Sequence, residues 1–365
     1  TQRFPFGQYR EARVITEERN SDFLLSANKK VSNDFTISGS VGGNQTKQKS
    51  DFNEINAGQL NIPGIYRLTN NRVPVDVSQS LTEKRVNSLY GASQLSYKNY
   101  LFLEVTGRND WSSALTLPAE LKALGNEQNS FFYSSAALSA VVSDMVKLPS
   151  FVNFAKVRGS LAQVGNDTDP FTFTQAYNPS TAFGTAQIYG ETDRLANLSL
   201  KPEISTSFEI GTEVKMLNNR IGLDLTFYQS NTKNQIINIP LSQTSGYSTR
   251  SINAGLIKNY GFEAMLSGKL NDHLSMMATV NYTKGRNVTA SIPLDHIPPV
   301  FGKLALVYTI GKLRTELFMN YSGWKRLEDY NMEGEDNFAY ATPYGMPSWA
   351  TVNARVNYNF SRQLS

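Results

Sequence analysis

The chain has few side chains of the kinds that perform covalent catalysis. It contains no cysteine, which excludes a disulfide framework, a cysteine-ligated zinc site and a thiol nucleophile. Its two histidines, His273 and His296, are far apart in sequence and lack carboxylates at metal-site spacing, so we expect plain surface residues. No G-x-S-x-G motif is present, which weakens a serine hydrolase hypothesis. We therefore predict no catalytic residues and no enzymatic activity.

Two acidic stretches could bind a hard cation. They are NDTDP (166–170) and DYNMEGEDN (329–337), and neither has the spacing of a calcium-binding loop. Acidic loops are more often simply solvated, so we predict no metal and no cofactor, with calcium in these loops as the lesser alternative.

The segment GRNDWSS (107–113) is the most distinctive polar and aromatic cluster. In one interpretation Trp111 stacks on a sugar while Asn109 and Asp110 bind it through hydrogen bonds. In the other, the segment is a turn cluster that closes the end of a strand, with its Asp and Asn bonded to the local backbone.

The composition limits the class of protein. Apolar residues make up 40% of the chain and charged residues 18%, which argues against disorder. The net charge of +4 is scattered rather than clustered, so no nucleic-acid partner is predicted. No segment approaches the roughly 18 apolar residues of a membrane-spanning helix. A membrane β-barrel is still allowed, because its strands need only about 9–11 residues with every second one apolar.

The elements that would position these residues are strands with a period of two. In RIGLDLTFY (220–228) apolar residues alternate with polar ones, and WATVNARVNYNF (349–360), LSMMATVNY (274–282) and NYLFLEVTGR (99–108) repeat the pattern. The polar positions carry charges that we expect to face a water-filled barrel interior, where they form cross-strand pairs or meet a plug: Arg108, Asp224, Glu263, Arg314, Glu316 and Arg355.

About fourteen strands are predicted, many of them longer than the usual strands of a soluble sandwich. Their ranges are 10–17, 21–29, 33–44, 84–96, 99–109, 130–141, 154–165, 203–216, 219–230, 254–268, 273–285, 301–309, 313–323 and 348–360.

Short and long connections alternate along the chain. The short turns are predicted at 29–33, 97–99, 217–219, 270–272 and 310–312, and the helix-like SDMVKLPS (143–150) counts as a longer member of this class. The long loops are predicted at 45–83, 110–129, 166–202, 231–253, 286–300 and 324–347. Short periplasmic turns and long extracellular loops are typical of an outer-membrane barrel, so we predict an all-β, transmembrane antiparallel barrel.

Several segments, in order, resemble those of one family. They are YLFLEVTGRNDWSSALTLP (100–118), NSFFYSSAALSAVVSD (129–144), VRGSLAQVGNDT (157–168), LKPEISTSFEIGTE (200–213), NTKNQIINIPLSQTSGYSTRSINAGLIKNYGFE (231–263) and IPPVFGKLALVY (297–308). This set is similar to the starch-utilisation-type (SusC/RagA-type) TonB-linked outer-membrane receptors of Bacteroidetes. The resemblance covers nearly the whole chain and favours the turn-cluster interpretation of GRNDWSS, because members of the family differ in substrate.

The resemblance implies a 22-stranded barrel with an N-terminal plug, located in the bacterial outer membrane among lipid and lipopolysaccharide. It implies active import of glycans or peptides, energised by the TonB complex and assisted by a SusD-like surface lipoprotein acting as a lid. We expect residues 1–365 to be a partial barrel domain, without the plug, the first strands or the last strands. The candidates for contact with an oligosaccharide or peptide substrate are Trp111, Tyr177, Tyr189, Tyr247, Trp324, Tyr340 and Tyr344.

Two alternatives from other classes stay open. One is a soluble, secreted β protein that binds carbohydrate, such as a lectin or adhesin. The other is a passive porin, which needs neither plug nor partner.

Overall fold

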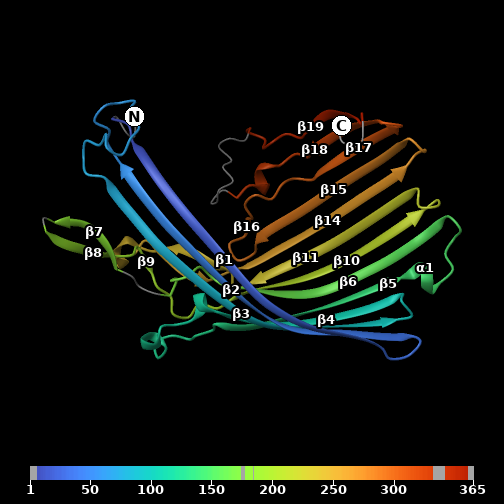
Figure 1. Cartoon of the computed structure of the whole chain (residues 1–365), viewed down its shortest axis with the longest axis horizontal. Coiled ribbons are helices and arrows are strands. Elements are labelled where there is room, and N and C mark those ends of the chain that lie inside the picture. The colour runs from blue at the N-terminus through green and yellow to red at the C-terminus, as the bar shows by residue number, and fades with distance from the viewer. Residues whose placement is uncertain (1–5, 174–176, 184, 332–341, 361–365) are drawn as a thin grey trace.

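The computed structural model describes residues 6–173, 177–183, 185–331 and 342–360. Most of these residues belong to one curved antiparallel sheet of fourteen strands, in which thirteen follow one continuous path and β16 pairs beside β15. The path order is β1-β2-β3-β4-β5-β6-β10-β11-β14-β15-β17-β18-β19, so neighbours in the sheet are neighbours in sequence apart from small loop strands. Figure 1 shows the curvature, with β1 to β3 running across in front of the remaining strands.

The strands of the path are long. Their bounds are β1 Tyr9–Lys30, β2 Phe35–Ala57, β3 Asp76–Tyr97, β4 Leu101–Ser112, β5 Ser130–Val141, β6 Val152–Asn166, β10 Glu203–Met216, β11 Ile221–Lys233, β14 Leu256–Lys269, β15 Leu274–Asn287, β17 Phe301–Ile310, β18 Leu313–Ser322 and β19 Trp349–Tyr358.

The long loops contain small elements of their own. β7 (Tyr177–Phe183) and β8 (Ala186–Glu191) form a hairpin, and β9 (Arg194–Leu195), β12 (Ile236–Pro240) and β13 (Thr249–Asn253) form a three-stranded ribbon. β16 covers Ile292–Pro293. The helices are α1 (Val142–Met145) and the 3₁₀ turns η1 (Ser113–Leu115), η2 (Ala119–Leu121), η3 (Gln243–Ser245) and η4 (Leu327–Asp329). Within the described residues no helix has the length and apolar character to cross a membrane.

The register confirms the predicted alternation of faces. Cross-strand partners share a face, and the chain of partners Leu103–Leu138–Gly159–Ile210–Phe227 joins apolar residues of β4, β5, β6, β10 and β11. We call this side of the sheet the apolar face. The opposite side, the polar face, holds all six predicted interior residues: Arg108, Asp224, Glu263, Arg314, Glu316 and Arg355.

The apolar face is exposed rather than packed against a second layer. Leu25 is 69% exposed, Val352 is 69% exposed and Leu161 is 58% exposed. On the polar face, in contrast, loop residues lie against the strands, because Asp167 contacts Lys84 of β3 and Ser112 of β4. A soluble sandwich would bury its apolar face, so this arrangement is that of a barrel wall with lipid outside and a polar interior.

One prediction about the strands was wrong. The segments 10–17 and 21–29 are a single strand, β1, which pairs with β2 without interruption from Tyr9 to Lys30. The polar run Glu17 to Ser21 resembles a turn in sequence, yet its backbone stays in the ladder. Likewise β2 and β3 continue well into the predicted loop 45–83, which leaves 58–75 as the connection.

All long connections lie at one end of the sheet, the loop end, and all short ones at the other, the turn end, as predicted (Figure 1). The β3–β4 turn has positive φ at Lys98 (48°) and Asn99 (58°), and the amide of Tyr100 donates to the carbonyl of Tyr97 at 3.1 Å. Positive φ at both central residues defines a type I′ turn, whose twist matches that of a hairpin. The expected 143–150 connection contains the short helix α1.

Candidate binding surfaces at the loop end

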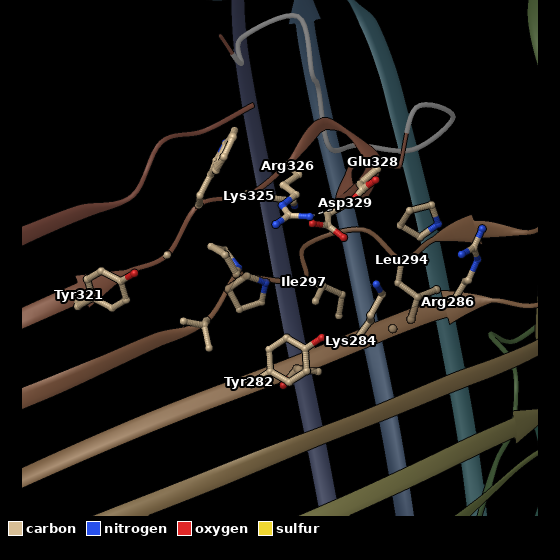
Figure 2. A pocket seen from close by; sticks show the side chains of 18 residues that line it. Tyr282, Lys284, Arg286, Leu294, Ile297, Tyr321, Lys325, Arg326, Glu328 and Asp329 are labelled. Carbon is tan, nitrogen blue, oxygen red and sulfur yellow. Dashed lines mark hydrogen bonds and ion pairs between the residues drawn. The ribbon is translucent and has the colours of Figure 1, made fainter. Parts of the chain in front are cut away.

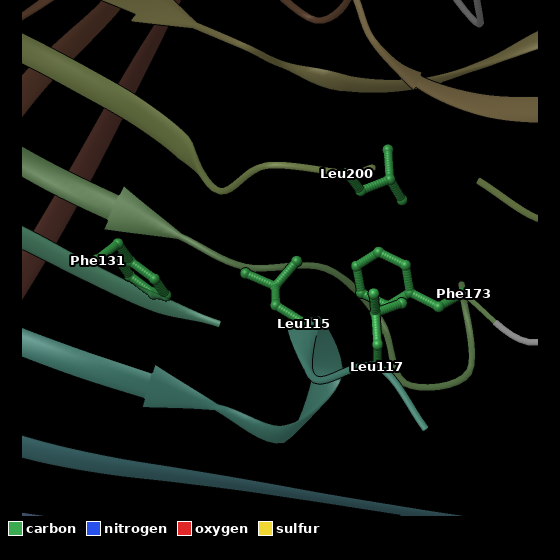
Figure 3. Packing of buried hydrophobic residues seen from close by; sticks show 5 residues of the cluster. All are labelled: Leu115, Leu117, Phe131, Phe173 and Leu200. Atoms are coloured by element: carbon green, nitrogen blue, oxygen red, sulfur yellow. The ribbon is translucent and has the colours of Figure 1, made fainter. Parts of the chain in front are cut away.

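A small hydrophobic cluster organises the long loops. It comprises Leu115, Leu117, Phe131, Phe173 and Leu200, shown in Figure 3, and it joins two loops to the start of β5. Leu115 and Leu200 are fully buried. Because the barrel wall has no core of its own, this cluster gives the loop end a fixed internal scaffold.

The GRNDWSS segment is divided between the two faces of β4. On the polar face, the buried Asp110 accepts hydrogen bonds from Arg108 Nε at 2.8 Å and from Tyr133 Oη at 2.7 Å. Arg108 also donates to Ser88 Oγ at 2.8 Å. Both oxygens of the Asp110 carboxylate are therefore hydrogen-bonded within the barrel wall. The segment is therefore structural, but it is a strand end bonded through side chains and not the turn bonded to local backbone that the sequence favoured.

Trp111 lies on the apolar face. It is 39% exposed and its strand neighbours on this side are Asn109 and Gly107, with Phe132 diagonal to it on β5. A ligand that passes through a barrel interior meets the opposite face. The position of Trp111 therefore suits the aromatic girdle at the loop-side edge of the lipid-facing surface rather than substrate contact.

A cavity of about 750 Å³ lies where the barrel wall is interrupted beside β15. β15 pairs with β14 as far as Asn287 but with β17 only as far as Asn281. Beyond this gap β16 closes the edge again, because Arg286 pairs with Pro293 and the amide of Leu294 donates to the carbonyl of Gly285 at 3.2 Å. Residues 282–284 therefore have no strand partner on this side among the described residues, and the chain after Leu294 and the chain after Tyr321 border the gap. The two bordering segments meet where the amide of Gly323 donates to the carbonyl of Val300 at 2.6 Å.

The cavity combines aromatic, cationic and anionic side chains. Figure 2 shows Tyr282, Lys284 and Arg286 along β15, opposite a segment that carries Arg326 and Asp329. The register places these three residues of β15 on the apolar face, so they border the cavity from the outer side of the wall. Trp324, one of the predicted contact residues, lines this cavity and is 53% exposed. Its Nε1 donates to the carbonyl oxygen of Tyr344 at 2.9 Å, and the Arg326 guanidinium lies 5.9 Å from its ring centre. A rigid aromatic face beside charged donors and acceptors can stack on a ligand and hydrogen-bond it at once.

A second group lies on the loop hairpins. Tyr177 Oη donates to Glu191 Oε1 at 3.0 Å and Tyr247 Oη donates to Glu191 Oε2 at 2.8 Å, so one carboxylate ties the β7–β8 hairpin to the chain before β13. The hydrogen bond to Glu191 raises the pKa of Tyr177, and the same interaction raises the pKa of Tyr247. Tyr189 is on the same hairpin and is 62% exposed.

Of the predicted contact residues, the structure therefore brings Trp324 next to Tyr344, and Tyr177 next to Tyr247. Tyr340 lies outside the described residues. Sequence reasoning missed Glu191, which joins the second pair, and Arg326, which lines the cavity beside Trp324. Glu191 and Tyr247 are 56 residues apart, and no local pattern indicates their contact.

Ion pairs cross the polar face. The guanidinium of Arg158 on β6 reaches over Gly211 of β10 to Asp224 of β11, with N–O distances of 3.1 and 3.3 Å. A Cβ at Gly211 would meet the Arg158 guanidinium at 2.7 Å, so glycine leaves the room for this crossing. Glu316 lies opposite Arg355, with their charged atoms 3.8 Å apart. The prediction omitted Arg158, although VRGSLAQ places it at an interior position.

The two histidines and the NDTDP loop are described by the structure. His273 lies in the β14–β15 turn, where its Nδ1 is 3.0 Å from the carbonyl oxygen of Thr309, and His296 is an exposed loop residue. In the NDTDP loop, Asp167 is engaged with Lys84 and Ser112. The described residues contain no group of three or more potential ligands, and residues 332–337 of the second acidic stretch lie outside them.

A curved antiparallel wall with an exposed apolar outer face, short turns at one end and long loops at the other defines an outer-membrane β-barrel protein. The chain belongs to the TonB-dependent receptor-like β-barrel family, whose model matches residues 2–365. It is accordingly an outer-membrane protein that crosses the bilayer with its strands.

Relatives in two genera support this assignment. The chain is 26% identical over 236 residues to TonB-dependent receptor P3 of Formosa agariphila, which covers 62% of this chain and 23% of that protein. It is 23% identical over 280 residues to TonB-dependent receptor P39 of the same organism, covering 74% and 26%. The metal-pseudopaline receptor CntO of Pseudomonas aeruginosa is 29% identical over 189 residues, covering 48% and 26%. The chain thus spans about a quarter of the length of the curated relatives it matches.

Solved structures share the fold. The RagAB peptide transporter matches with a TM-score of 0.72 at 14% identity, over 86% of this chain and 42% of that one. The copper transporter OprC matches with a TM-score of 0.62 at 14% identity, over 96% and 50%. At these identities the likeness concerns the barrel architecture alone.

Proposed function

We propose that this chain forms the barrel wall and part of the ligand-capturing loops of an importer for oligosaccharides or peptides. In this proposal, transport is energised by the TonB complex through a plug domain, and a SusD-like surface lipoprotein covers the loop end. The observation that carries the proposal is the family match over nearly the whole chain. The likeness in fold to the RagAB peptide transporter is consistent with it.

The loop end supplies surfaces suited to such ligands. The cavity at β15 presents Trp324 beside Arg326 and Asp329, which suits ring stacking together with hydrogen bonds to hydroxyl, carbonyl or carboxylate oxygens. The Tyr177–Glu191–Tyr247 group offers a second polar aromatic surface. In this mechanism the chain breaks no covalent bond, because its residues only bind and orient the ligand. The energy for transport comes from the TonB complex of the inner membrane.

The proposal is tested with the full-length receptor in its own outer membrane. A strain that lacks the receptor should lose growth on the oligosaccharide or peptide mixture that the wild type consumes. Deleting TonB should abolish the uptake to the same extent. Uptake that continues without TonB would instead identify a passive porin and would overturn the proposal.

The role of the cavity is tested by two substitutions of tryptophan, one in the cavity and one on the outer face. Trp324→Ala should reduce uptake at limiting substrate by about tenfold, the loss expected when a stacking contact with the ligand of about 1.5 kcal/mol disappears. Trp111→Phe, on the outer face, should leave uptake unchanged. Equal uptake by both variants and the wild type would remove the cavity from the transport path.

The lipoprotein is tested separately. Mild detergent extraction of the affinity-tagged receptor should co-purify a lipid-anchored surface protein in constant proportion. If the receptor purifies alone and still imports, the lid is not part of the machinery.

A further inference from the structure

The loop-side end of β6 leaves the barrel wall on one side. β6 pairs with β5 only as far as Ala162, which lies opposite Ser135, although its pairing with β10 continues to Asn166. Residues 163–166 are therefore still part of a ladder with β10 but have separated from β5. The wall is divided at this point between β5 and β6.

The side-chain positions show in which direction the end of β6 folds. By the alternation of β6, Gly165 lies on the same side as Gly159, which belongs to the apolar face. A Cβ at Gly165 would nevertheless collide with the ring of Phe131 and lie 3.2 Å from the ring of Tyr133. Both rings belong to the polar face of β5. The end of β6 therefore lies on the inner side of β5, and glycine at 165 leaves room for this close approach.

An ion pair fastens this inward segment to two further strands. Asp167, the first residue after β6, contacts the Lys84 ammonium of β3 with one carboxylate oxygen and the Ser112 hydroxyl of β4 with the other. Lys84 also donates to the carbonyl of Thr168 at 3.3 Å. The side chains of Asp167 and Lys84 are only 11% and 19% exposed. We call Asp167, Lys84 and Ser112 the loop clamp.

The loop clamp holds more firmly than a surface ion pair. Water screens exposed pairs, whereas the charges of Asp167 and Lys84 are largely shielded from it. Ser112 is 1% exposed, and its hydroxyl donates to Asp167 while it accepts from the amide of Ala114 at 3.2 Å. Removal of one member would leave a shielded charge without its partner, which is costly. The loop clamp thus favours one position for the start of the loop.

The register offers a released end of β6 a second position. If the ladder continued beyond Ser135 and Ala162, Phe132 would lie opposite Gly165, and residues 163–166 would close onto 131–134. The loop after β6 would then start from the wall itself and not from its inner side. The loop clamp opposes this exchange, because it joins Asp167 to two strands that are not neighbours of β6.

The clamped segment leads to one of the candidate ligand surfaces. Six residues after Asp167, Phe173 enters the hydrophobic cluster and is 2% exposed. Tyr177 follows four residues later and shares the Glu191 carboxylate with Tyr247. Buried contacts at the start of the loop thus precede the exposed aromatic group that it presents.

We propose that Asp167 is a positioning residue for ligand capture. Through the loop clamp it holds the loop after β6 on the inner side of the wall, and this places the Tyr177–Glu191–Tyr247 group where an imported ligand meets it. The inference rests on the proposed function, in which this group is a ligand surface. Asp167 itself contacts no ligand. It keeps the loop in the binding-competent position, so that the ligand does not have to order it.

The first test compares two aspartates of the same loop in the full-length receptor. Uptake is measured against concentration for an oligosaccharide digest of starch and for a tryptic digest of serum albumin. Asp167→Ala should raise the half-saturating concentration at least about tenfold, the factor of one hydrogen bond to a charged group, with the maximal rate within about twofold of wild type. The matched control Asp169→Ala, at an exposed position two residues further on, should change neither quantity by more than about twofold.

A covalent link in place of the loop clamp provides a rescue. The chain contains no cysteine, so S112C/D167C introduces one pair, at two side chains that are already in contact. When reduced, this variant should take up ligand as weakly as Asp167→Ala. When oxidised, it should have a half-saturating concentration within about threefold of wild type, because the disulfide holds the loop in the clamped position.

A readout without ligand separates the positioning role from the import function. In ultraviolet titration of the purified receptor, Asp167→Ala should lower the raised pKa of the Tyr177 and Tyr247 phenols, since their hydrogen bonds to Glu191 depend on the clamped loop. Asp169→Ala should leave both phenols as in the wild type. If the phenols shift while the wild type takes up neither digest, the positioning role holds and the proposed function fails.

Three outcomes would overturn the proposal. They are wild-type uptake and phenol titration in folded Asp167→Ala, an equal loss in Asp169→Ala, and no difference between reduced and oxidised S112C/D167C. Heat-modifiable migration on gels verifies that each variant is folded. The cysteine variant is compared with itself, so it decides the matter even where Asp167→Ala fails to fold.

Discussion

The strands β1 to β3 and the strands β17 to β19 belong to one sheet but differ in length by a factor of about two. The first three span 22, 23 and 22 residues, and the last three span 10 residues each. Both groups start from short connections at the turn end. The short strands are therefore about as long as the bilayer requires, whereas the long strands continue past it into the loop region.

The outer faces of the two groups show what the membrane selects. Along β17 to β19 the outward positions stay apolar or aromatic over almost the whole strand, as at Leu304, Leu317 and Val352. Along β1 to β3 the apolar outward residues are concentrated near the turn end, and the row of cations Arg19, Lys47 and Arg85 follows. Farther toward the loops the outward positions are mixed, with Ile15 and Leu81 on either side of Asp51. Contact with lipid thus requires apolar outward side chains over about ten residues of each strand. Beyond the membrane, the backbone hydrogen bonds between β1, β2 and β3 continue without this requirement.

The largest effect is expected from a charge placed on the lipid-facing part of either group of strands. Leu25→Arg on β1 and Val352→Arg on β19 should each reduce the free energy of unfolding by about 2–4 kcal/mol, because both face lipid near its midplane. Ser21→Arg, two outward positions beyond Leu25 toward the loops, should cost only about 0–1 kcal/mol. Denaturant unfolding of the full-length protein in phospholipid vesicles measures all three. Equal losses at Leu25 and Ser21 would show that the lipid-facing part of β1 ends elsewhere.

A second pair compares how tightly the two regions pack. A Cβ at Gly302 of β17 would collide with the backbone oxygen of Thr279, whereas a Cβ at Gly39 of β2 would have its nearest neighbour, the oxygen of Ala92, at 3.7 Å. Gly302→Ala should therefore destabilise the barrel by about 1–3 kcal/mol through overpacking. Gly39→Ala should stay within about 0.5 kcal/mol of wild type. The same vesicle assay applies, and a tolerated Gly302→Ala would mean that the two strands can separate locally.

A smaller effect compares charges on the polar face. Asp224→Asn loses the paired hydrogen bonds to Arg158 and should destabilise by about 1 kcal/mol, since both groups are one-third exposed and screened by solvent. Glu316→Gln weakens a looser pair with Arg355 and should cost about 0.5 kcal/mol. Raising the salt concentration should shrink both differences. A loss at Asp224 that is independent of salt would instead indicate a packing role.

The smallest effect concerns the loop hairpins. Because the hydrogen bond to Glu191 raises the pKa of Tyr177 and of Tyr247, the folded hairpins hold these phenol protons more tightly than an unfolded chain does. The stabilisation by these hydrogen bonds is fully present below the ordinary tyrosine pKa of about 10. It is lost as the pH rises through the raised pKa of each phenol. In ultraviolet titration, Glu191→Gln should shift two phenols to lower pKa than in the wild type. In the double variant Y177F/Y247F, the further substitution Glu191→Gln should leave the ultraviolet titration curve unchanged.

Much of the wall was predictable because its information is local. Side chains alternate every residue, so segments such as RIGLDLTFY identify a strand and its two faces without knowledge of the neighbours. The turns were predictable for the same reason, since Lys98 and Asn99 lie between two alternating segments. The bounds of β5 and β10 match the predicted 130–141 and 203–216.

The candidate site was far less predictable. Trp324 was identified as an aromatic loop residue, but its cavity exists because β15 outruns its partner β17, which depends on register. Trp111 was grouped with the contact candidates because aromatic residues near loops look alike in sequence. Only the face of β4 on which it lies distinguishes a membrane anchor from a ligand contact.

By itself the sequence determined that the chain forms a barrel wall with turns at one end and loops at the other, because alternation and connection length are encoded residue by residue. The tertiary structure decided where β1 to β3 end, which loop side chains meet at Glu191, and that three cations stand in one row. Ladder hydrogen bonds form with any side chain, so a polar strand in water leaves no periodic signal, and contacts between distant segments depend on strand order and register rather than on local pattern.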